Sequence, residues 1–383
     1  MSGRHAPTDG SGPRNGGGAV GSDPSRLYVR YRITGRDVAE VAEAIRVEQT
    51  IEFPVDLAAH WIRTDVVGAV EETGPDSVVV SYAPGVIAGG LTQFLNVLWG
   101  NVSLFEGVRV EAIQLPDGAA SLRGPRFGTS GLREVFAAPT RALLVTALKP
   151  MGSSSAELAG AAGTLAAAGI DIIKDDHSLG DQPWSPWYER VARCSEAVAE
   201  ANSRTGGRAV YMPSLNVPAP EVHERAHAAK ELGAGALMAL PGISGFDSMR
   251  ALADDDSLAL PLMSHPSMLG SLMVNRSQGI SHGLVLGLLN RLAGADLSVF
   301  PNHGGRFGFS QAECAEIRDE AAAPRDTLLA TVPAPGGGMT VERVPELLEF
   351  YGNDVALLIG GALHRGDLAA NAWRMREAVE SAG

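Results

Sequence analysis

The chain has 383 residues and a formal net charge of −13, with 31 basic and 44 acidic side chains. This length exceeds a single ordinary core and favours two domains or one large barrel with an appended domain. The negative charge, the lack of a concentrated basic run and the short apolar segments argue against nucleic acid or a membrane as partner. The N-terminus also lacks a hydrophobic signal core, so we expect a soluble, cytoplasmic protein.

The N-terminal third predicts a tail and a small domain. Residues 1–25 are rich in Gly, Ser and Pro without apolar periodicity, which indicates a disordered tail. Apolar spacing then predicts strands at 28–33, 77–82 and 108–115 and helices at 38–45 and 91–99. We interpret residues 26–138 as an N-terminal α+β domain.

From residue 139 to 383 one unit repeats, an apolar strand followed by a helix rich in Ala and Leu. Eight strands are predicted near 142–149, 170–175, 208–214, 235–240, 258–264, 297–301, 327–332 and 355–360. Eight such units over roughly 240 residues match a (β/α)8 barrel, the TIM barrel. An open doubly wound sheet is the alternative, but the chain lacks the Gly-x-Gly-x-x-Gly turn that usually begins one.

Polar side chains gather at the C-terminal ends of these strands, where barrel enzymes place their active sites. They are Lys149, Lys174, Asp176, His177, Asn216, His265, Asn302 and His303, and the last strand ends in Gly360 and Gly361. Only three of the 31 basic residues are lysines, and two of them stand at strand ends. An amine can lose its proton and act as a base or nucleophile, whereas a guanidinium stays protonated. The two lysines are therefore candidates for chemistry.

The residues of the second strand end have two interpretations. Asp176 and His177 can hold a cation, and Lys174 can join them if CO₂ converts its amine to a carbamate, whose anionic oxygen suits Mg²⁺. The alternative is a buried Lys174–Asp176 ion pair that orients a loop. Lys149 likewise is either a general acid or base, or the partner of a neighbouring carboxylate.

Three further motifs lie on the barrel. Glycine-rich turns follow the last two strands, Pro335-Gly336-Gly337-Gly338 and Gly360-Gly361, where barrels commonly bind phosphate through backbone N–H groups. The segment 302–308, with Arg306, is either a lid over the ligand or an ordinary surface loop. His223 and His227 have a spacing that can bind metal, but no third ligand is near them in sequence, so we interpret them as a solvated helix face.

Several motifs, in this order, resemble the large subunit of ribulose-bisphosphate carboxylase, and the chain is most similar to the RuBisCO-like proteins, the form IV branch that does not fix CO₂. The motifs are Val47-Glu48-Gln49-Thr50, Trp99-Gly100-Asn101-Val102, Leu148-Lys149-Pro150, the stretch 169–177 ending in Lys174-Asp175-Asp176-His177, Ser264-His265-Pro266, Gly336-Gly337-Gly338 and Gly360-Gly361. The resemblance extends from residue 27 to the C-terminus. It implies a C-terminal (β/α)8 TIM barrel preceded by a small α+β (ferredoxin-like) N-terminal domain.

The resemblance also implies a cofactor and roles for individual residues. It implies CO₂ bound as a carbamate on Lys174 and one Mg²⁺ per subunit held by Lys174, Asp176 and His177. A glutamate is usual where His177 stands, and the softer imidazole makes Mn²⁺ or Co²⁺ possible substitutes. The resemblance further implies acid/base catalysis for Lys149, and proton relay or binding of substrate hydroxyl groups for His265 and His303. It implies that substrate or phosphate is bound by Arg306, Gly337, Gly338, Gly360 and Gly361. Glu48 and Asn101 are implied to reach the active site of a partner subunit. A homodimer or an assembly of dimers is therefore expected.

Departures from the carboxylase pattern narrow the implied reaction. Met151 and Arg306 stand where lysines are expected, and Pro266 replaces an arginine for a second phosphate, so CO₂ fixation is not expected. What remains is metal-dependent enolisation of a phosphorylated ketose, and the motif is most similar to the isomerase that acts on 5-methylthioribulose 1-phosphate in methionine salvage. The alternatives are 2,3-diketo-5-methylthiopentyl-1-phosphate enolase, a decarboxylase of an oxo-sugar acid phosphate, or a non-catalytic sugar-phosphate sensor.

Overall fold

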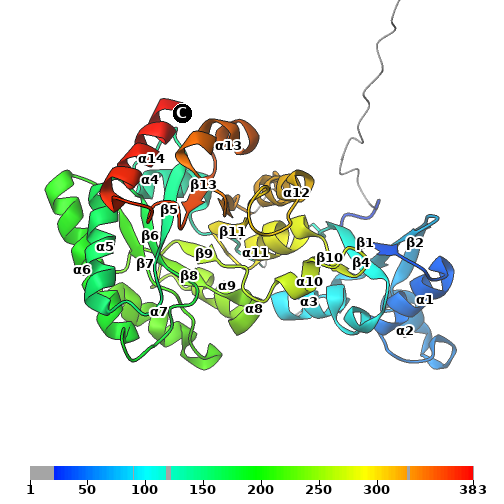
Figure 1. Ribbon diagram of the computed structural model, residues 1–383. Helices are drawn as coiled ribbons and strands as arrows, with labels where there is room; N and C mark the ends of the chain where they lie inside the picture. The colour runs from blue at the N-terminus through cyan, green and yellow to red at the C-terminus, as the bar shows by residue number, and fades with distance from the viewer. Residues whose placement is uncertain (1–20, 89, 118–121, 326–327, 383) are drawn as a thin grey trace, which may run out of the picture.

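The computed structural model describes residues 21–88, 90–117, 122–325 and 328–382. Most of the predicted tail, residues 1–25, lies outside these ranges. The described chain contains two sheets, a five-stranded one near the N-terminus and an eight-stranded one that forms a nearly closed barrel (Figure 1). No helix within the described ranges has the length and apolar character needed to cross a bilayer.

The smaller sheet has a ferredoxin-like connectivity, as predicted. Its elements are β1 (Leu27–Ile33), α1 (Val38–Glu48), α2 (His60–Asp65), β2 (Ala69–Thr73), β3 (Ser77–Tyr82), α3 (Leu91–Trp99) and β4 (Val108–Gln114). The strands pair in the order β4-β1-β3-β2, and all of these pairs are antiparallel. Asp37 caps α1, because its carboxylate accepts a hydrogen bond from the backbone N–H of Glu40. Apolar residues of β1, β3 and the helices form the core of this layer.

Two strands of this sheet were not predicted. Every residue of β2 is exposed, so the strand carries no apolar alternation that could reveal it. The other is β10 (Gly279–Ile280), which comes from the barrel half of the chain and pairs in parallel with Arg109 and Val110 of β4. The Arg109 side chain reinforces this junction by donating to the backbone carbonyls of Met273 and Asn275.

Eight parallel strands form the barrel, which confirms the predicted fold. They are β5 (Leu143–Leu148), β6 (Ile172–Asp175), β7 (Val210–Met212), β8 (Leu237–Ala239), β9 (Leu262–Ser264), β11 (Leu297–Pro301), β12 (Val332–Gly336) and β13 (Ala356–Ile359). The order is β7-β6-β5-β13-β12-β11-β9-β8. The ring closes between β7 and β8 through a single bridge from Ser214 to Met238.

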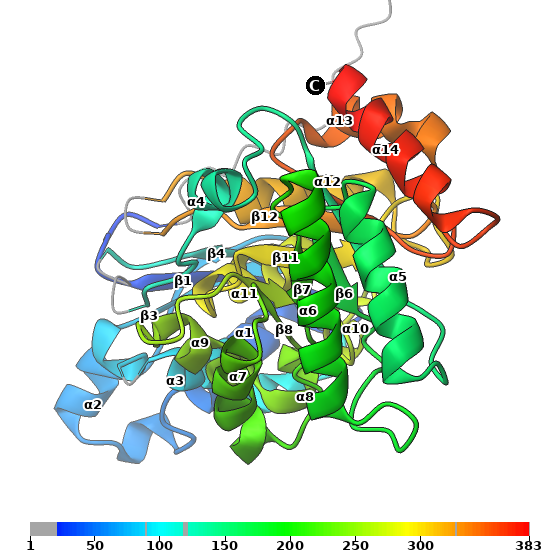
Figure 2. The ribbon, with the colours of Figure 1, turned by 90° about the vertical axis from the view of Figure 1, so that its left-hand side faces the viewer.

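Helices cover the outside of the barrel, and Figure 2 shows α5 and α6 side by side against it. They are α5 (Ser155–Ala167), α6 (Trp187–Thr205), α7 (Val222–Glu231), α8 (Pro241–Ser244), α9 (Phe246–Asp254), α10 (Gly270–Met273), a buried π-helical segment (Gly283–Leu289), α11 (Asn290–Leu292), α12 (Gln311–Ala322), α13 (Val344–Tyr351) and α14 (Leu368–Ala382). Capping boxes at Ser154 with Glu157 and at Ser310 with Glu313 fix where α5 and α12 begin.

The seventh barrel strand was predicted at 327–332 but lies at Val332–Gly336. Pro333 and Pro335 made this stretch look like a turn, since proline cannot donate to a sheet. The N–H of Val332 donates to the Asp296 carbonyl on the β11 side, so the two prolines face β13 instead. On the β13 side, β12 pairs only through Gly336 and Leu358, so few backbone N–H donors are needed from β12. Gly336 therefore belongs to the strand, and the turn begins at Gly337.

A helix from the first part of the chain closes the bottom of the barrel. Leu132 of α4 (Gly128–Val135), with Phe136 and Ala138, packs against Val145 and other residues of the barrel interior. The cluster includes Leu143, Leu297 and Ala356, the first residues of β5, β11 and β13. It therefore fills the N-terminal end of the barrel, opposite the predicted site. The domain boundary at residue 138 stays a prediction, since α4 lies before it and packs on the barrel.

Candidate active site

The predicted barrel-site residues lie at or near the C-terminal ends of the strands. Lys149 follows β5, Lys174 is in β6 with Asp176 and His177 just past it, His265 follows β9, Asn302 and His303 follow β11, Gly337 and Gly338 follow β12, and Gly360 and Gly361 follow β13. Because the strands are parallel, these ends meet at one rim of the barrel.

Lys174 is a buried amine. Its side chain extends from β6 into the interior, where the residue is only 1% exposed. Its Nζ donates to the Asp175 carbonyl at 2.8 Å and lies 3.3 Å from Sδ of Met238. Burial lowers the pKa of Lys174 to about 8, and the nearby Asp176 offsets this only in part. At neutral pH on the order of a tenth of the molecules therefore carry a neutral amine here.

The carboxylate of Asp176 is shared by three neighbours. Lys149 forms an ion pair with its Oδ2, and Nδ1 of His177 lies 3.1 Å from its Oδ1. Ser178 donates to Oδ1 through both its backbone N–H and its hydroxyl. Burial alone would raise the pKa of Asp176, but the hydrogen bonds from His177 and Lys149 outweigh it and hold this pKa well below its usual range. Asp176 is thus an anion, with the Lys149 ammonium at Oδ2 and His177 and Ser178 at Oδ1.

His177 and His265 meet across the barrel mouth. Their rings stack with centroids 4.6 Å apart and an interplanar angle of 10°, although β6 and β9 are not neighbouring strands. Nδ1 of His265 lies 2.9 Å from the Ser267 hydroxyl, which fixes the ring orientation. Burial, together with the nearby Lys174, holds the pKa of His265 well below its ordinary value. His265 is therefore neutral at neutral pH.

A buried network beneath β6 supports the site, and sequence reasoning missed most of it. Asp175 is fully buried, and its carboxylate accepts hydrogen bonds from Arg190, from the Tyr211 hydroxyl at 2.6 Å and from the Ser214 N–H at 3.1 Å. Neighbouring residues of a strand point to opposite faces, so Asp175 faces away from the cluster that Lys174 faces. The one available signal was the acidic pair itself, because its first member, Asp175, points into the core and needs a buried partner there.

The end of β11 presents polar atoms without protein partners. Asn302 is fully buried, and its Oδ1 accepts from the Tyr351 hydroxyl at 2.7 Å. Its Nδ2 and the Nε2 of His303 are both buried and have no hydrogen-bond partner in the described structure. Unsatisfied buried polar atoms are rare in proteins, so these two are expected to face a ligand or water.

The glycine turns offer open backbone. Gly337 and Gly338 have φ values of 96° and 68°, which favour glycine. A Cβ placed on Gly337, Gly360 or Gly361 would meet no other atom within 4 Å. This space allows an anion to approach the backbone N–H groups.

No contact joins the other three predicted site residues to Asp176 or its partners in the described structure, so their roles stay predictions. Arg306 is exposed, and its guanidinium lies 4.8 Å from the Phe307 ring centroid. Glu48 and Asn101 hydrogen bond to each other at 2.8 Å in the N-terminal layer, which Figure 1 shows far from β5 and β6 of the same chain. Their predicted role in a partner subunit's site stays a prediction.

The donor set at β6 fits a divalent cation. Asp176 and His177 place a carboxylate oxygen and an imidazole nitrogen 3.1 Å apart, and the ammonium of Lys149 already occupies the other oxygen. That ammonium marks a place where positive charge is stabilised. Lys174 supplies a partly neutral amine, the form that reacts with CO₂, although its Nζ bonds here to a carbonyl and a thioether rather than to the other two residues.

Comparison with known proteins identifies relatives over most of the chain. Residues 128–308 match the model for the ribulose bisphosphate carboxylase large chain, catalytic domain. Ribulose bisphosphate carboxylase-like protein 1 of Rhodopseudomonas palustris is 37% identical, over 88% of this chain and 92% of the relative. The 5-methylthioribulose-1-phosphate isomerase of Rhodospirillum rubrum is 37% identical, over 89% of this chain and 92% of the relative. The 2,3-diketo-5-methylthiopentyl-1-phosphate enolase of Bacillus pumilus is 34% identical, over 89% of this chain and 88% of the relative. The crystal structure of a Rubisco-like protein from Rhodopseudomonas palustris superposes with a TM-score of 0.83 at 35% identity, covering 94% of this chain and 99% of that one.

Proposed function

The chain belongs to the RuBisCO-like proteins of the ribulose bisphosphate carboxylase large-chain family, and from this we propose that it catalyses metal-dependent enolisation of a phosphorylated ketose. The isomerase type is favoured, with 5-methylthioribulose 1-phosphate of methionine salvage as the substrate. The observation that carries the proposal is the buried, partly neutral amine of Lys174 on the same strand end as Asp176 and His177.

Lys174, Asp176 and His177 are the proposed ligands of the cofactor. Neutral Lys174 would react with CO₂ to form a carbamate and release one proton, which would turn the neutral amine into an anion at the centre of the site. When bound there, Mg²⁺, or Mn²⁺ or Co²⁺ in its place, would polarise the ketone and adjacent hydroxyl of the substrate. Met238 lies 3.3 Å from the amine, and the buried Asp175–Arg190 ion pair supports the same strand end from its other face.

The other residues of the rim have proposed roles in binding and proton transfer. Lys149 is the proposed acid/base, since its amine is half-buried at the mouth and held by Asp176. His265 is positioned by Ser267, and His303 has a free buried nitrogen, so both can contact substrate hydroxyl groups or relay a proton. The N–H groups of the two glycine turns are the proposed phosphate site, and Arg306 can join it from the adjacent loop.

The isomerase and the enolase are separated by modest differences in similarity. The relative named as the isomerase is 37% identical to the chain, and the relative named as the enolase is 34% identical. Both reactions remove a proton next to a ketone, so the site described above suits either one. The enolase is therefore the second candidate.

Proton NMR in D₂O with Mg²⁺ and bicarbonate tests the proposal. With 5-methylthioribulose 1-phosphate we expect the α-proton signal to disappear and an isomerised product to form. Exchange with the diketo phosphate alone would assign the enolase instead. Tight binding of both compounds without exchange would favour a sensor, and the absence of binding and exchange would contradict the proposal.

A homodimer is the proposed functional unit, with Glu48 and Asn101 completing the site of the other subunit. Both side chains are accessible on one face of the N-terminal layer and contact each other. Mixed dimers test this arrangement: a Glu48→Gln subunit and a Lys174→Ala subunit should each be inactive alone. Recovered activity on mixing and refolding the two supports shared sites, and no recovery argues that each chain works alone.

A further inference from the structure

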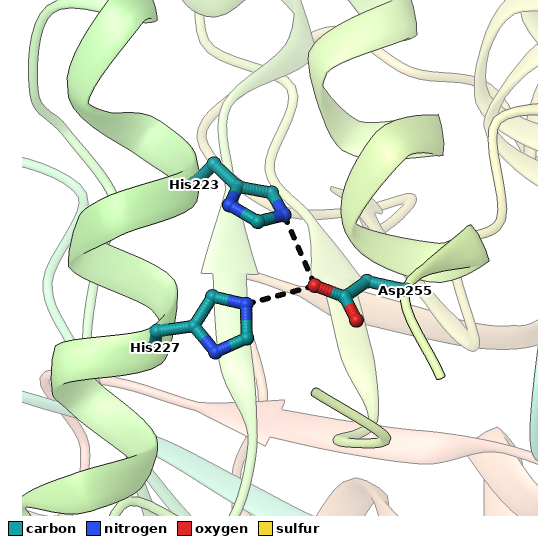
Figure 3. Close-up of side chains that lie close together, drawn as sticks. All are labelled: His223, His227 and Asp255. Carbon is teal, nitrogen blue, oxygen red and sulfur yellow. Dashed lines mark hydrogen bonds and ion pairs between the residues drawn. The ribbon is translucent and has the colours of Figure 1, made fainter. Parts of the chain in front are cut away.

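A second group of metal-binding side chains lies on the outside of the barrel. His223 and His227, four residues apart on α7, direct their rings at Asp255, which follows α9 (Figure 3). Nε2 of His223 lies 3.0 Å from Oδ2 of Asp255, and Nε2 of His227 lies 2.8 Å from the same oxygen. The three ligand atoms lie within 4.8 Å of one another.

The structure corrects our interpretation of this helix face. The sequence alone predicts a solvated face, because no third ligand is near the two histidines along the chain. Asp255 supplies it from 28 residues beyond His227, because α7 and α9 pack against each other. Only the fold brings these ligands together.

Asp255 is held in place independently of the histidines. Its Oδ1 accepts hydrogen bonds from the Ser257 N–H at 2.8 Å, the Ser257 hydroxyl at 2.6 Å and the Leu258 N–H at 3.3 Å. Lys230 ties the same turn to α7 by donating to the Ser257 and Leu258 carbonyls. Oδ2 is therefore left directed at the two imidazoles, as outer hydrogen bonds orient the ligands of known metal sites.

We propose that His223, His227 and Asp255 bind a divalent transition-metal ion, with Zn²⁺ or Co²⁺ as the best fit. Two imidazoles and one carboxylate suit these borderline ions, whereas Mg²⁺ and Ca²⁺ prefer oxygen ligands. This site is separate from the barrel mouth and does not depend on the proposed reaction.

The two nitrogen–oxygen separations are close to those of a tetrahedral metal site. With metal–ligand bonds of about 2.0–2.1 Å, ligand atoms in a tetrahedral site lie roughly 3.3 Å apart. The observed separations of 3.0 and 2.8 Å from Oδ2 of Asp255 require an opening of only a few tenths of an ångström. The two imidazole nitrogens lie within 4.8 Å of each other, and binding would bring them to the same spacing. The side chain of His223 is 58% exposed and that of Asp255 16%, so water can complete the coordination from the His223 side.

The bound ion would link α7 to the turn between α9 and β9. Such a link stabilises the folded chain by mass action, because the separated ligands of the unfolded chain bind less tightly. The expected role is structural.

Metal binding to the untagged, chelator-treated full chain tests the site. We expect equilibrium dialysis with Co²⁺ to show that the wild type binds one equivalent per chain more than the double variant His223→Ala, His227→Ala. The visible absorption of that Co²⁺ should be lost in the double variant as well. Ser257→Ala should weaken binding on the order of tenfold. His60→Ala, at an exposed histidine elsewhere, should bind as the wild type does.

Two comparisons separate this site from the barrel mouth. Lys174→Met should keep the equivalent that the double variant loses, and Zn²⁺ should raise the melting temperature of wild type and Lys174→Met but not of the double variant. The double variant should fold, since alanine favours helix and His223 is exposed. Equal Co²⁺ uptake and equal Zn²⁺ shifts in wild type and double variant would overturn the proposal.

Discussion

Lys149 and His177 bind opposite oxygens of the same carboxylate, that of Asp176. The proposed acid/base and a proposed metal ligand are therefore joined through one side chain. Positive charge at one oxygen weakens the attraction of the other for a cation. Proton transfer and metal binding should consequently be coupled.

Replacing Lys149 by methionine tests this coupling. The variant should lower the rate of α-proton exchange by about 10²–10⁴-fold, the usual contribution of a positioned acid or base. It should also bind Mn²⁺ more tightly, because no ammonium competes for Oδ2 of Asp176. Electron paramagnetic resonance of free Mn²⁺ measures the affinity, and Arg193→Met, which removes a half-exposed cation from the outer helix α6, is the control. Weaker Mn²⁺ binding in Lys149→Met would contradict the competition.

Lys174→Met should remove the carbamate. The side chain has a similar length but no amine, and the residue is buried beside Met238, so an apolar group is tolerated there. We expect a carbamate signal in ¹³C NMR with labelled bicarbonate in the wild type and none in the variant. Proton exchange should fall at least ~100-fold, more than the loss typical of outer-shell changes. A persistent carbamate signal would assign the CO₂ to another amine, and Lys230→Arg should keep both properties.

Gly360→Ala should weaken phosphate binding without disturbing the fold. Its φ is not in the left-handed region and a Cβ would meet nothing within 4 Å, so the backbone accepts alanine. The methyl group would stand where an anion approaches the N–H groups, and we expect KM to rise about tenfold, or roughly 1.4 kcal/mol of binding. Gly85→Ala, equally open but in the N-terminal layer, should leave KM unchanged. An unchanged KM in Gly360→Ala would place the phosphate elsewhere.

Arg190→Met should be strongly destabilising. The change leaves the fully buried Asp175 without its cation, and breaking such a pair typically costs about 3–5 kcal/mol. The double variant Asp175→Asn, Arg190→Met removes both charges and should recover part of that loss. Urea unfolding followed by circular dichroism measures the difference. If the double variant is no more stable than Arg190→Met alone, the buried charge is not the cause.

Asp296 should make stability depend on pH. It is 1% exposed, and burial raises its pKa to about 6 although it accepts three backbone N–H groups. Between about pH 4 and 6 the folded chain holds a proton that the unfolded chain releases, so this residue's contribution to stability falls as pH rises through that window. The free energy of unfolding of the wild type, relative to that of Asp296→Asn, should fall by about 2 kcal/mol from pH 4 to 6. A difference that is constant or grows would show that the carboxylate is ionised throughout.

Local patterns predicted the barrel and its rim because each strand carries its own apolar run and ends in its own polar residues. Lys149, Lys174 and His265 could be placed on the rim in this way. Patterns failed where structure depends on distant partners. The strand β2 has no apolar face, and the prolines of β12 are tolerated only because its β13 side pairs at one position.

Contacts between distant residues were beyond sequence reasoning for the same reason. The Arg190 partner of Asp175 lies 15 residues away on a helix, and nothing in its local pattern distinguishes it from a surface arginine. The stacking of His177 on His265 depends on barrel closure, and the position of Asp255 depends on the packing of α7 and α9. Periodicity identifies elements but does not specify which side chains meet between them.

The parallel pairing of β10 with β4 affects the order of events during synthesis. When only the first 138 residues have emerged from the ribosome, β4 is an open edge of the small sheet, because its partners Gly279 and Ile280 have not yet been made. Arg109 likewise lacks the carbonyls of Met273 and Asn275 until then. On the ribosome, the first layer to emerge can be finished only after much of the second has followed it.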